Sequence, residues 1–378
     1  MSCSPYSFRM RSYAAHGRRF PPTAWLLLLA CSGADPDAAD VNAADGLTTV
    51  PVTRGELIAT FGGFGRLSLD NVRGIALAKD GNSVHVLDTH HVHHLDLNGR
   101  RLASMGGPGM GPGELEAPTA IHATAGGGAW VYDPTSGRAT RYGPDASVEA
   151  EISGIDQRDA PFVPFGDGIL MSAVRKPRVP VEGAAVSDSP RLAIHTEELN
   201  PDRLLAYYRV SGEVLDVESP PGVPDAFARD GRRGRVIGWR MAAVSPNEIA
   251  VVVGGSDLGA WRLVLADGGA RIESLEELPV PADVRRTVRE NAERGRGVFT
   301  MPIASARVVG NSLWVVSTDR DYPWDEPLAL SIPLDGDTIS YRLARQGLGS
   351  GLVDVIVLPD RLIVAYSTSV RFLALAPA

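Results

Sequence analysis

One pattern of apolar and polar positions recurs through the body of the chain. Each copy joins two apolar stretches through a short turn of Gly, Asn, Asp or Pro, which is typical of a β-hairpin. The β-branched and aromatic residues that fill these stretches suit a pleated strand. Six copies are present, and their second strands contain Val84, Ala129, Ile169, Ile249, Leu313 and Leu362.

The spacing of the copies indicates the fold class. Successive copies are 45, 40, 80, 64 and 49 residues apart. A repeat of about 40–50 residues with several strands is the period of a β-propeller blade. The 80-residue step contains a polar, Pro-rich stretch at 175–200, which we interpret as a loop, and a strand at 204–215. Because this step has room for a further blade, a seven-bladed ring stays open as an alternative to six blades.

The 64-residue step contains the one helix that the sequence predicts, at about 282–294. Asp283 suits the positive N-terminal end of a helix, and Gly295 ends the helical pattern. The remaining elements are strands, so the fold class is all-β with a single inserted helix.

The two ends of the repeat region predict how the ring closes. A strand at 56–61 precedes the first copy, and the last copy ends at 372–375, one strand short of a four-stranded blade. Pairing these strands would remove a free sheet edge. The prediction is therefore a six-bladed β-propeller over residues 55–378, with N-to-C strand closure.

A glycine-rich segment between the first two copies resembles a known signature. Residues 106–118 contain Gly-Pro-Gly-Glu-Leu at 111–115 and Pro118. This segment is similar to the inter-blade G-x-G-P-G-E-[FL]-x-x-P signature of bacterial six-bladed β-propeller proteins related to NHL repeats. Asp88 and Asp133, each followed by a turn and a strand, fit the same resemblance. It covers roughly residues 55–376 and implies the fold without implying an activity.

The same glycines do not predict a phosphate-binding loop. That chemistry needs a helix N-terminus after the glycines, and a P-loop needs a Lys. Here a strand follows residues 106–113, and no Lys is present in the segment.

The N-terminus has the pattern of a secretory signal. Four arginines within residues 9–19 precede an apolar run at 24–30, which is too short to span a bilayer. Leu28-Leu29-Ala30-Cys31 resembles the lipobox of bacterial lipoproteins, although a small residue is commoner at position 29. The resemblance implies a signal peptide over 1–30 and a lipid on Cys31. The alternative is an ordinary cleaved signal with a bystander cysteine. The Ala- and Asp-rich segment 31–54 is predicted to be a flexible tether.

Composition narrows the classes of function. Without the first 30 residues, which hold four basic and no acidic residues, 33 basic residues face 45 acidic ones, a net charge of −12. Such a chain repels nucleic acid. The cysteines are Cys3 and Cys31, so the body has neither a disulfide framework nor a Cys-based metal site. No run of 18 uncharged apolar residues follows residue 31. We expect a monomer in the bacterial cell envelope, on either the periplasmic or the cell-surface side.

Three charged residues interrupt apolar stretches that are predicted to be innermost strands. Ligands of propellers usually bind in the central channel that these strands line. Arg73, Arg240 and Asp354 would there grip a polar or anionic ligand. The alternative is that they are strand-end charges or inter-blade ion pairs. The predicted innermost strands begin near 72–75, 119–121, 162–164, 238–241, 301–303 and 353–355.

The histidine cluster His90, His91, His93 and His94 is a weaker candidate. Two imidazoles on one strand face can hold a metal, but a further ligand must come from elsewhere. The cluster begins at a turn, which favours a solvated position on the outer part of a blade. We predict no metal, no cofactor and no catalytic residue, and we assign no role to His122 and His195.

The predicted function is non-catalytic binding of a protein, peptide or glycan through the loop face of a membrane-anchored propeller. The alternative is a lactonase-like or related metal-dependent hydrolase that uses the central channel. Such an enzyme needs several acidic or amide residues around a central calcium, and Asp70 and Asp354 are the nearest carboxylates. The sequence contains neither G-x-S-x-G nor H-E-x-x-H.

Overall fold

A computed structural model describes most of the chain beyond residue 39. Residues 39–378 form one compact unit. The predicted signal peptide and Cys31 lie outside the described residues. The described ranges are 40–42, 47–51, 56–63, 69–155, 161–172, 203–219, 238–254, 258–293, 303–317, 327–335, 340–344 and 351–375.

Three of the sheets contain four antiparallel strands each. In each of them, neighbours in the sheet are consecutive strands of a meander, except that β3 completes the third sheet. The first sheet contains β4 (Gly74–Leu77), β5 (Ser83–Leu87), β6 (His91–Asp96) and β7 (Arg101–Gly106). The second contains β8 (Ala120–Ala123), β9 (Ala129–Asp133), β10 (Arg138–Tyr142) and β11 (Val148–Ser153). The third contains β24 (Leu352–Val357), β25 (Arg361–Tyr366), β26 (Ser369–Ala374) and β3 (Leu57–Gly62).

Two larger sheets contain the other strands. The eight-stranded sheet is a pair of four-stranded meanders, which only one parallel pair, Glu218 with Arg271, joins in the described residues. Its halves are β12 (Phe162–Phe165), β13 (Gly168–Ser172), β14 (Arg203–Arg209) and β15 (Val214–Glu218), and β16 (Gly238–Ser245), β17 (Glu248–Gly254), β18 (Leu258–Ala266) and β19 (Arg271–Glu277). The six-stranded sheet contains β20 (Ser305–Val309), β21 (Ser312–Val316), β22 (Pro327–Pro333), β23 (Ser340–Ala344), β2 (Leu47–Pro51) and β1 (Asp40–Asn42).

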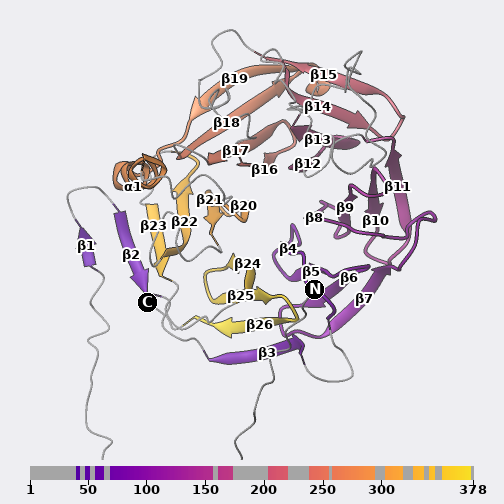
Figure 1. Cartoon of the computed structure of the whole chain (residues 1–378), viewed down its shortest axis with the longest axis horizontal. Helices are drawn as coiled ribbons and strands as arrows, with labels where there is room; N and C mark the ends of the chain where they lie inside the picture. Colours follow the sequence, from indigo (N-terminus) through magenta and orange to yellow (C-terminus); the bar gives the residue numbers. More distant parts are fainter. Residues whose placement is uncertain are drawn as a thin grey trace, which may run out of the picture. The chain divides into compact units, whose positions relative to one another are not determined.

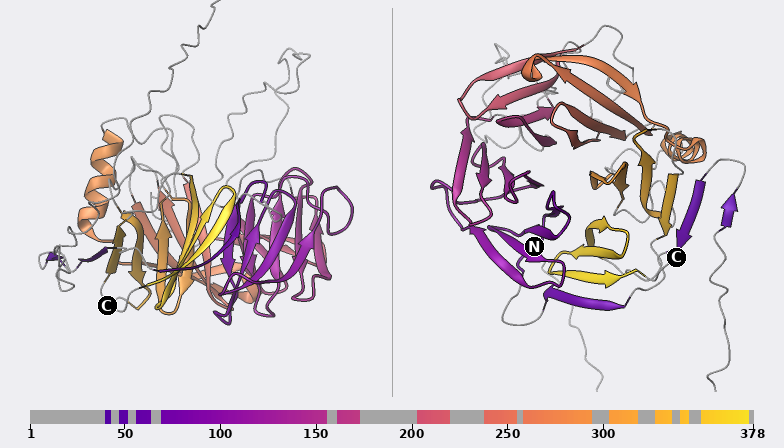
Figure 2. Two further views of the ribbon diagram at one scale, coloured as in Figure 1. Left: turned by 90° about the horizontal axis from the view of Figure 1, so that it is seen from below. Right: turned by 180° about the vertical axis from the view of Figure 1, so that it is seen from behind.

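The sheets stand around a common centre as in a β-propeller (Figures 1 and 2). The first strand of each meander is the innermost, and these strands are β4, β8, β12, β16, β20 and β24. The apolar cores lie between neighbouring meanders, because second strands such as β5, β9 and β13 are buried on both of their faces. Six apolar clusters join neighbouring meanders, and residues that share a cluster include Leu87 and Val131, Tyr132 and Ile169, Val163 and Val251, Ala250 and Leu313, Val316 and Val364, and Phe372 and Val86.

Several sequence predictions are confirmed. All six predicted hairpins are antiparallel strand pairs. The predicted ring closure is present as the antiparallel pairing of β26 with β3, in which Val370 lies opposite Phe61. The inserted helix is α1 (Ala282–Glu293), which buries Val284 and Val288 against the sheets.

Three details differ from the prediction. The strand expected at 204–215 is two strands, β14 and β15, because the chain turns at 210–213. The innermost strand expected near 301–303 begins at Ser305 instead. Within the predicted tether, β1 and β2 pair with each other, and β2 adds in parallel to β23. The β-branched Thr48–Val50 segment suits this strand, and it covers an otherwise free sheet edge.

The meander topology sorts the connections onto two sides of the ring. The connections that enter innermost strands, or lead from second to third strands, all emerge on one side, which we name the loop face. This face receives α1 (Figure 2) and every connection longer than six residues. The connections on the opposite side, the turn face, have two to six residues. The long connections therefore lie on the side where the innermost strands begin, which is the side expected to hold a ligand site.

Candidate functional site: a polar ring in the central channel

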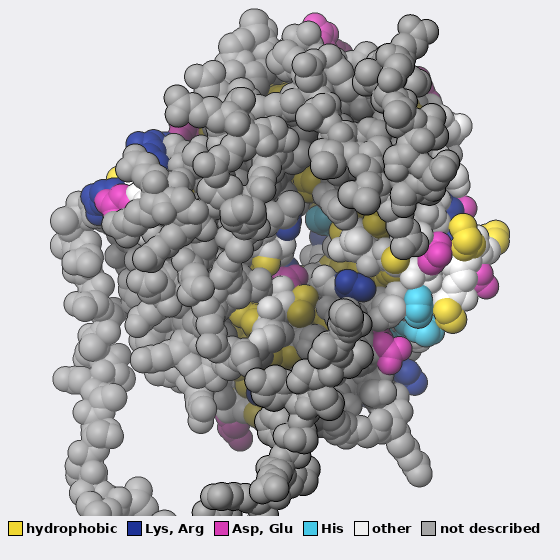
Figure 3. All heavy atoms as spheres, viewed as in Figure 1, with side chains coloured by type: hydrophobic (Ala, Val, Ile, Leu, Met, Phe, Trp, Pro, Cys, Tyr) yellow, Lys and Arg dark blue, Asp and Glu magenta, His cyan; other side chains and the backbone are white. Residues whose placement is uncertain are grey.

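Four polar side chains occupy the same position in different innermost strands. His122, Arg240, Arg307 and Asp354 are each the third residue of their strand, counted from the loop face. The corresponding residues of β4 and β12 are Ala76 and Pro164. We name His122, Arg240, Arg307 and Asp354, together with Ser305, the polar ring. The space-filling view shows a central hollow in which cationic, acidic and histidine side chains are visible (Figure 3).

Asp354 is the acceptor at the centre of the polar ring. Its side chain is buried, and both carboxylate oxygens accept hydrogen bonds. Oδ1 accepts from the Ser305 hydroxyl at 2.6 Å and from the Val355 N–H at 2.8 Å. Oδ2 accepts from Arg307 at 2.5 Å and from the Ile75 N–H at 3.4 Å. These donors satisfy a buried charge that would otherwise be costly.

Arg307, on β20, contacts the innermost strands of two other sheets, β24 and β4. Its guanidinium forms an ion pair with Asp354 and donates to the Ser305 hydroxyl at 3.0 Å and to the Ile75 carbonyl at 3.3 Å. Its charge also acts on His122, on β8. The Nε atom of Arg307 is buried and donates no hydrogen bond among the described residues. A buried N–H without an acceptor is unusual in a native protein.

Arg240 and His122 complete the ring. Arg240 donates from Nε to the Ala304 carbonyl at 2.8 Å. Burial lowers the pKa of Arg240, and the Asp354 carboxylate opposes this shift. Because the pKa of a guanidinium starts far above neutral pH, Arg240 stays charged. Burial, and next the Arg307 charge, lower the pKa of His122 to about 4, while a backbone hydrogen bond at Phe162 opposes the shift. His122 is therefore neutral at pH 7, and the ring carries two guanidinium charges against one carboxylate.

The structure places two of the three predicted channel residues in the polar ring. Arg240 and Asp354 belong to the polar ring, and the field of Asp354 acts on Arg240. Arg73 directly precedes β4, is exposed, and takes no part in the ring's hydrogen bonds among the described residues. Sequence reasoning missed Arg307 and His122. Both are polar residues inside short apolar strands, which is the signal that singled out Asp354.

Asp88 and Asp133 perform a structural task. Asp133 accepts hydrogen bonds from the N–H groups of Glu116 and Ala117 at 2.7 and 3.2 Å. Asp88 accepts from the N–H groups of Asn71 and Thr89 at 2.8 and 2.7 Å. Each carboxylate thus fixes the segment that leads into the innermost strand of its own sheet.

The glycine-rich signature is held in a similar way. Arg138 donates to the carbonyls of Gly111 and Glu114, both at 3.0 Å. The Tyr142 hydroxyl donates to the Gly113 carbonyl at 2.8 Å. The signature is therefore a connection fixed by its neighbours, and its carbonyls are engaged within the protein.

The histidine cluster does not form a metal centre. His90 contacts the Leu115 carbonyl through Nδ1 at 3.0 Å, and His93 lies 3.9 Å from an Asp88 oxygen. Burial raises the pKa of Asp88, but His93 and backbone N–H donors outweigh burial and hold it well below its usual range. Across the described parts of the chain, no group of three or more His, Cys, Asp or Glu residues is placed to hold a metal ion.

One member of the histidine cluster, His94, is buried inside the first sheet, so the predicted solvated position is wrong for this residue. The rings of His85 and His94 stack with centroids 4.4 Å apart, and His94 contacts the Ser83 hydroxyl at 2.8 Å. His85 is fully buried. Burial, and next the neighbouring His94, lower the pKa of His85 to about 4.

Replacing His85 with Leu is expected to make the protein more resistant to acid. An unfolded His has a pKa of about 6.5, so between pH 6.5 and pH 4 the unfolded chain binds a proton at this position and the folded chain does not. Above pH 6.5 this difference does not affect the free energy of unfolding. As the pH falls towards 4, His85 lowers the free energy of unfolding by roughly 3 kcal/mol. Urea unfolding at pH 8 and pH 5 measures the effect. The loss between the two pH values should be smaller in His85→Leu, and an equal loss in both proteins would contradict it.

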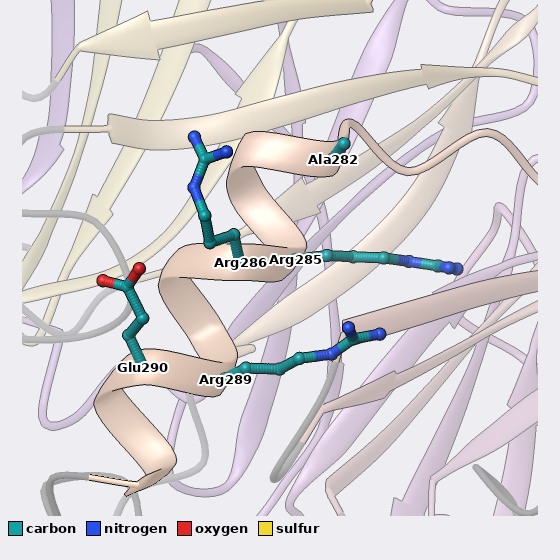
Figure 4. Close-up of a pocket in the computed structure, with 5 residues that line it drawn as sticks. All are labelled: Ala282, Arg285, Arg286, Arg289 and Glu290. Atoms are coloured by element: carbon teal, nitrogen blue, oxygen red, sulfur yellow. The ribbon is translucent and has the colours of Figure 1, made fainter.

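A hollow beside α1 is the other candidate pocket (Figure 4). It is lined by Ala282, Arg285, Arg286, Arg289 and Glu290. Arg285 donates to the Leu258 carbonyl at 3.1 Å and forms an ion pair with Glu277. Arg285 thus attaches α1 to the neighbouring sheet, and the hollow is a groove along an exposed helix. We therefore take the polar ring as the functional site.

Comparisons with known proteins identify no family. No protein-family model and no curated protein matches the chain. Similar solved structures include an inactive variant of virginiamycin B lyase from Staphylococcus aureus with quinupristin, at 11% identity and a TM-score of 0.44, covering 84% of this chain and 99% of that one. A gluconolactonase from Xanthomonas campestris has 10% identity and a TM-score of 0.44, with 86% and 98% covered.

A third similar structure is a protein of unknown function from Bacteroides caccae, at 12% identity and a TM-score of 0.43, with 73% and 82% covered. At these values the similarities carry no argument about activity, so the site rests on the geometry of this chain. In the part of the chain that the structure describes, no helix is long and apolar enough to cross a membrane.

Proposed function

We propose that this chain is a six-bladed β-propeller that binds a ligand at the mouth of its channel on the loop face. The blade count treats each half of the eight-stranded sheet as one blade, since a single bridge joins them. It treats β1 and β2 as an addition to the blade formed by β20–β23. Six apolar clusters, each between two consecutive blades, support this count.

The donor set of the polar ring is the observation that carries a binding function. Among the described residues of the innermost strands, Asp354 is the single carboxylate, and both of its oxygens already accept hydrogen bonds. A calcium ion needs six to eight oxygen ligands. Guanidinium groups repel a cation, and Arg240 and Arg307 lie in the same ring. These residues do not fit the metal-dependent hydrolase that we consider as the alternative.

Adding calcium tests the choice between binding and hydrolysis. We expect the same thermal unfolding midpoint with calcium and with a chelator, and no opening of a lactone substrate. Magnesium at equal ionic strength is the control for general salt effects. A midpoint that rises with calcium alone, together with lactone hydrolysis, would favour the hydrolase and sink the binding proposal.

We also propose that a lipid on Cys31 holds the propeller at a membrane in the cell envelope. Diacylation of a cysteine anchors stably, because two acyl chains bury many methylene groups at about 0.8 kcal/mol each. In a bacterial host, Cys31→Ala should move the protein from the membrane pellet to the soluble fraction. Cys3→Ala is the matched control and should stay in the pellet. Membrane retention of Cys31→Ala would rule out the lipid.

The ligand that we propose for the channel mouth is a protein, peptide or glycan.

A further inference from the structure

The charge of the polar ring narrows the class of ligand. Two guanidinium groups, on Arg240 and Arg307, face one carboxylate, on Asp354, so the ring has one net positive charge. His122 adds none, since burial and the Arg307 charge hold its pKa near 4. One further negative charge would neutralise the ring, whereas a doubly charged phosphate would leave a surplus negative charge in a partly buried site.

The ring side chains are placed to receive such a group. Arg240, His122, Ser305 and Arg307 are mostly buried, but each keeps part of its surface exposed. They lie near the loop-face ends of their strands, where the channel opens. A guanidinium has a planar fork of N–H donors that matches the two oxygens of a carboxylate.

The hydrogen bonds of Arg307 leave one donor for a ligand. Two of its nitrogens are engaged with Asp354, Ser305 and Ile75, but the buried Nε is engaged with nothing in the described residues. A buried donor without a partner destabilises a protein unless something in its working state accepts from it. A ligand oxygen would be such an acceptor once the Arg307 side chain turns to bring Nε to the channel surface.

We propose that the polar ring binds a carboxylate group of the ligand, with Arg240 and Arg307 as its donors. This inference rests on the proposed binding function and specifies its chemistry. The carboxylate belongs either to a peptide or to an acidic sugar, and both present the same planar anion to the ring.

Matched acid and neutral probes test the proposal. N-acetylalanine and glucuronate represent the two sources, while N-acetylalaninamide and glucose are their neutral counterparts. Inorganic phosphate represents the more highly charged anions. Binding to the full-length protein is measured by ligand-observed NMR at constant ionic strength. We expect at least one acid to bind at least tenfold more tightly than its neutral counterpart. The acid that binds identifies the source, and phosphate should bind more weakly.

Variants then locate the site. Arg240→Gln should weaken acid binding about tenfold or more, and Arg240→Lys should weaken it less, because the charge stays while the planar fork is lost. Arg361→Gln is the control, since Arg361 begins β25 at the turn face and pairs with Asp360. It should bind as the parent does. Arg240→Lys keeps the test valid if Arg240→Gln does not fold.

Four results would overturn the carboxylate proposal. They are no binding of either acid, binding of both acids that is no tighter than that of their neutral counterparts, tighter binding of phosphate, or an equal loss in Arg361→Gln. Any of these leaves the binding function standing when calcium has no effect. A calcium effect on the parent protein would instead overturn the binding function itself.

Discussion

A chain that begins at Leu69 is expected to lose its cooperative unfolding transition, because it lacks β3. In the complete protein β3 covers β26, and Phe61 packs in the core with Phe372, which are 5% and 0% exposed. Removing one buried Phe side chain alone costs about 3–5 kcal/mol. Loss of the whole strand also uncovers an apolar sheet edge. The combined loss approaches the entire stability of an ordinary domain, about 5–15 kcal/mol.

Urea unfolding followed by circular dichroism measures this effect. A chain that begins at Glu56 is the matched control, since it keeps β3 but lacks β1 and β2. We expect the control to unfold in one sharp transition and the shorter chain to show a broad one, with aggregation. An unchanged midpoint in the chain from Leu69 would mean that the ring does not depend on this closure.

Replacing Asp354 with Ala is expected to destabilise the protein by about 3–5 kcal/mol, the usual cost of breaking a buried ion pair. The side chains of Arg307 and Asp354 are only 14% and 7% exposed, so solvent screens the pair weakly. The variant leaves the Arg307 charge without its counter-ion and takes the acceptor from Ser305 and the Val355 N–H.

The reverse change should cost less. In Arg307→Met, Asp354 still accepts from Ser305, Val355 and Ile75. The double variant should cost less than the sum of the two single ones, because neither charge is then left unpaired. Denaturant unfolding of all four proteins gives the coupling energy. Additive effects would show that the pair is not an energetic unit.

The hairpins and the closing strand could be predicted because their signals are local. Turn residues and alternating apolar residues determine each hairpin, and counting strands leaves one at each end to pair. The helix was predictable for the same reason, since Asp283 and the glycine after it mark its ends. Strand β2 was not predictable in this way, because its β-branched residues lie in an Asp-rich segment whose composition indicates a flexible tether.

The candidate site was predictable only in part. Asp354 and Arg240 are charged residues in apolar strands, so the pattern alone reveals them. Arg307 was missed because the apolar residues at 301–303 predict an innermost strand that begins there, whereas β20 begins at Ser305. The effect of the Arg307 charge on His122, on β8, depends on how the whole ring closes and has no local signal.

The attachment of β2 to β23 changes how far a lipid on Cys31 would let the propeller travel. If residues 31–56 were a free leash, an extended chain would reach roughly 90 Å. With β2 paired to β23 and β1 paired to β2, only residues 32–39 separate Cys31 from β1, and a chain of that length spans at most about 30 Å when fully extended. A lipidated protein would then stay close to the bilayer and would bind ligands that arrive near that surface.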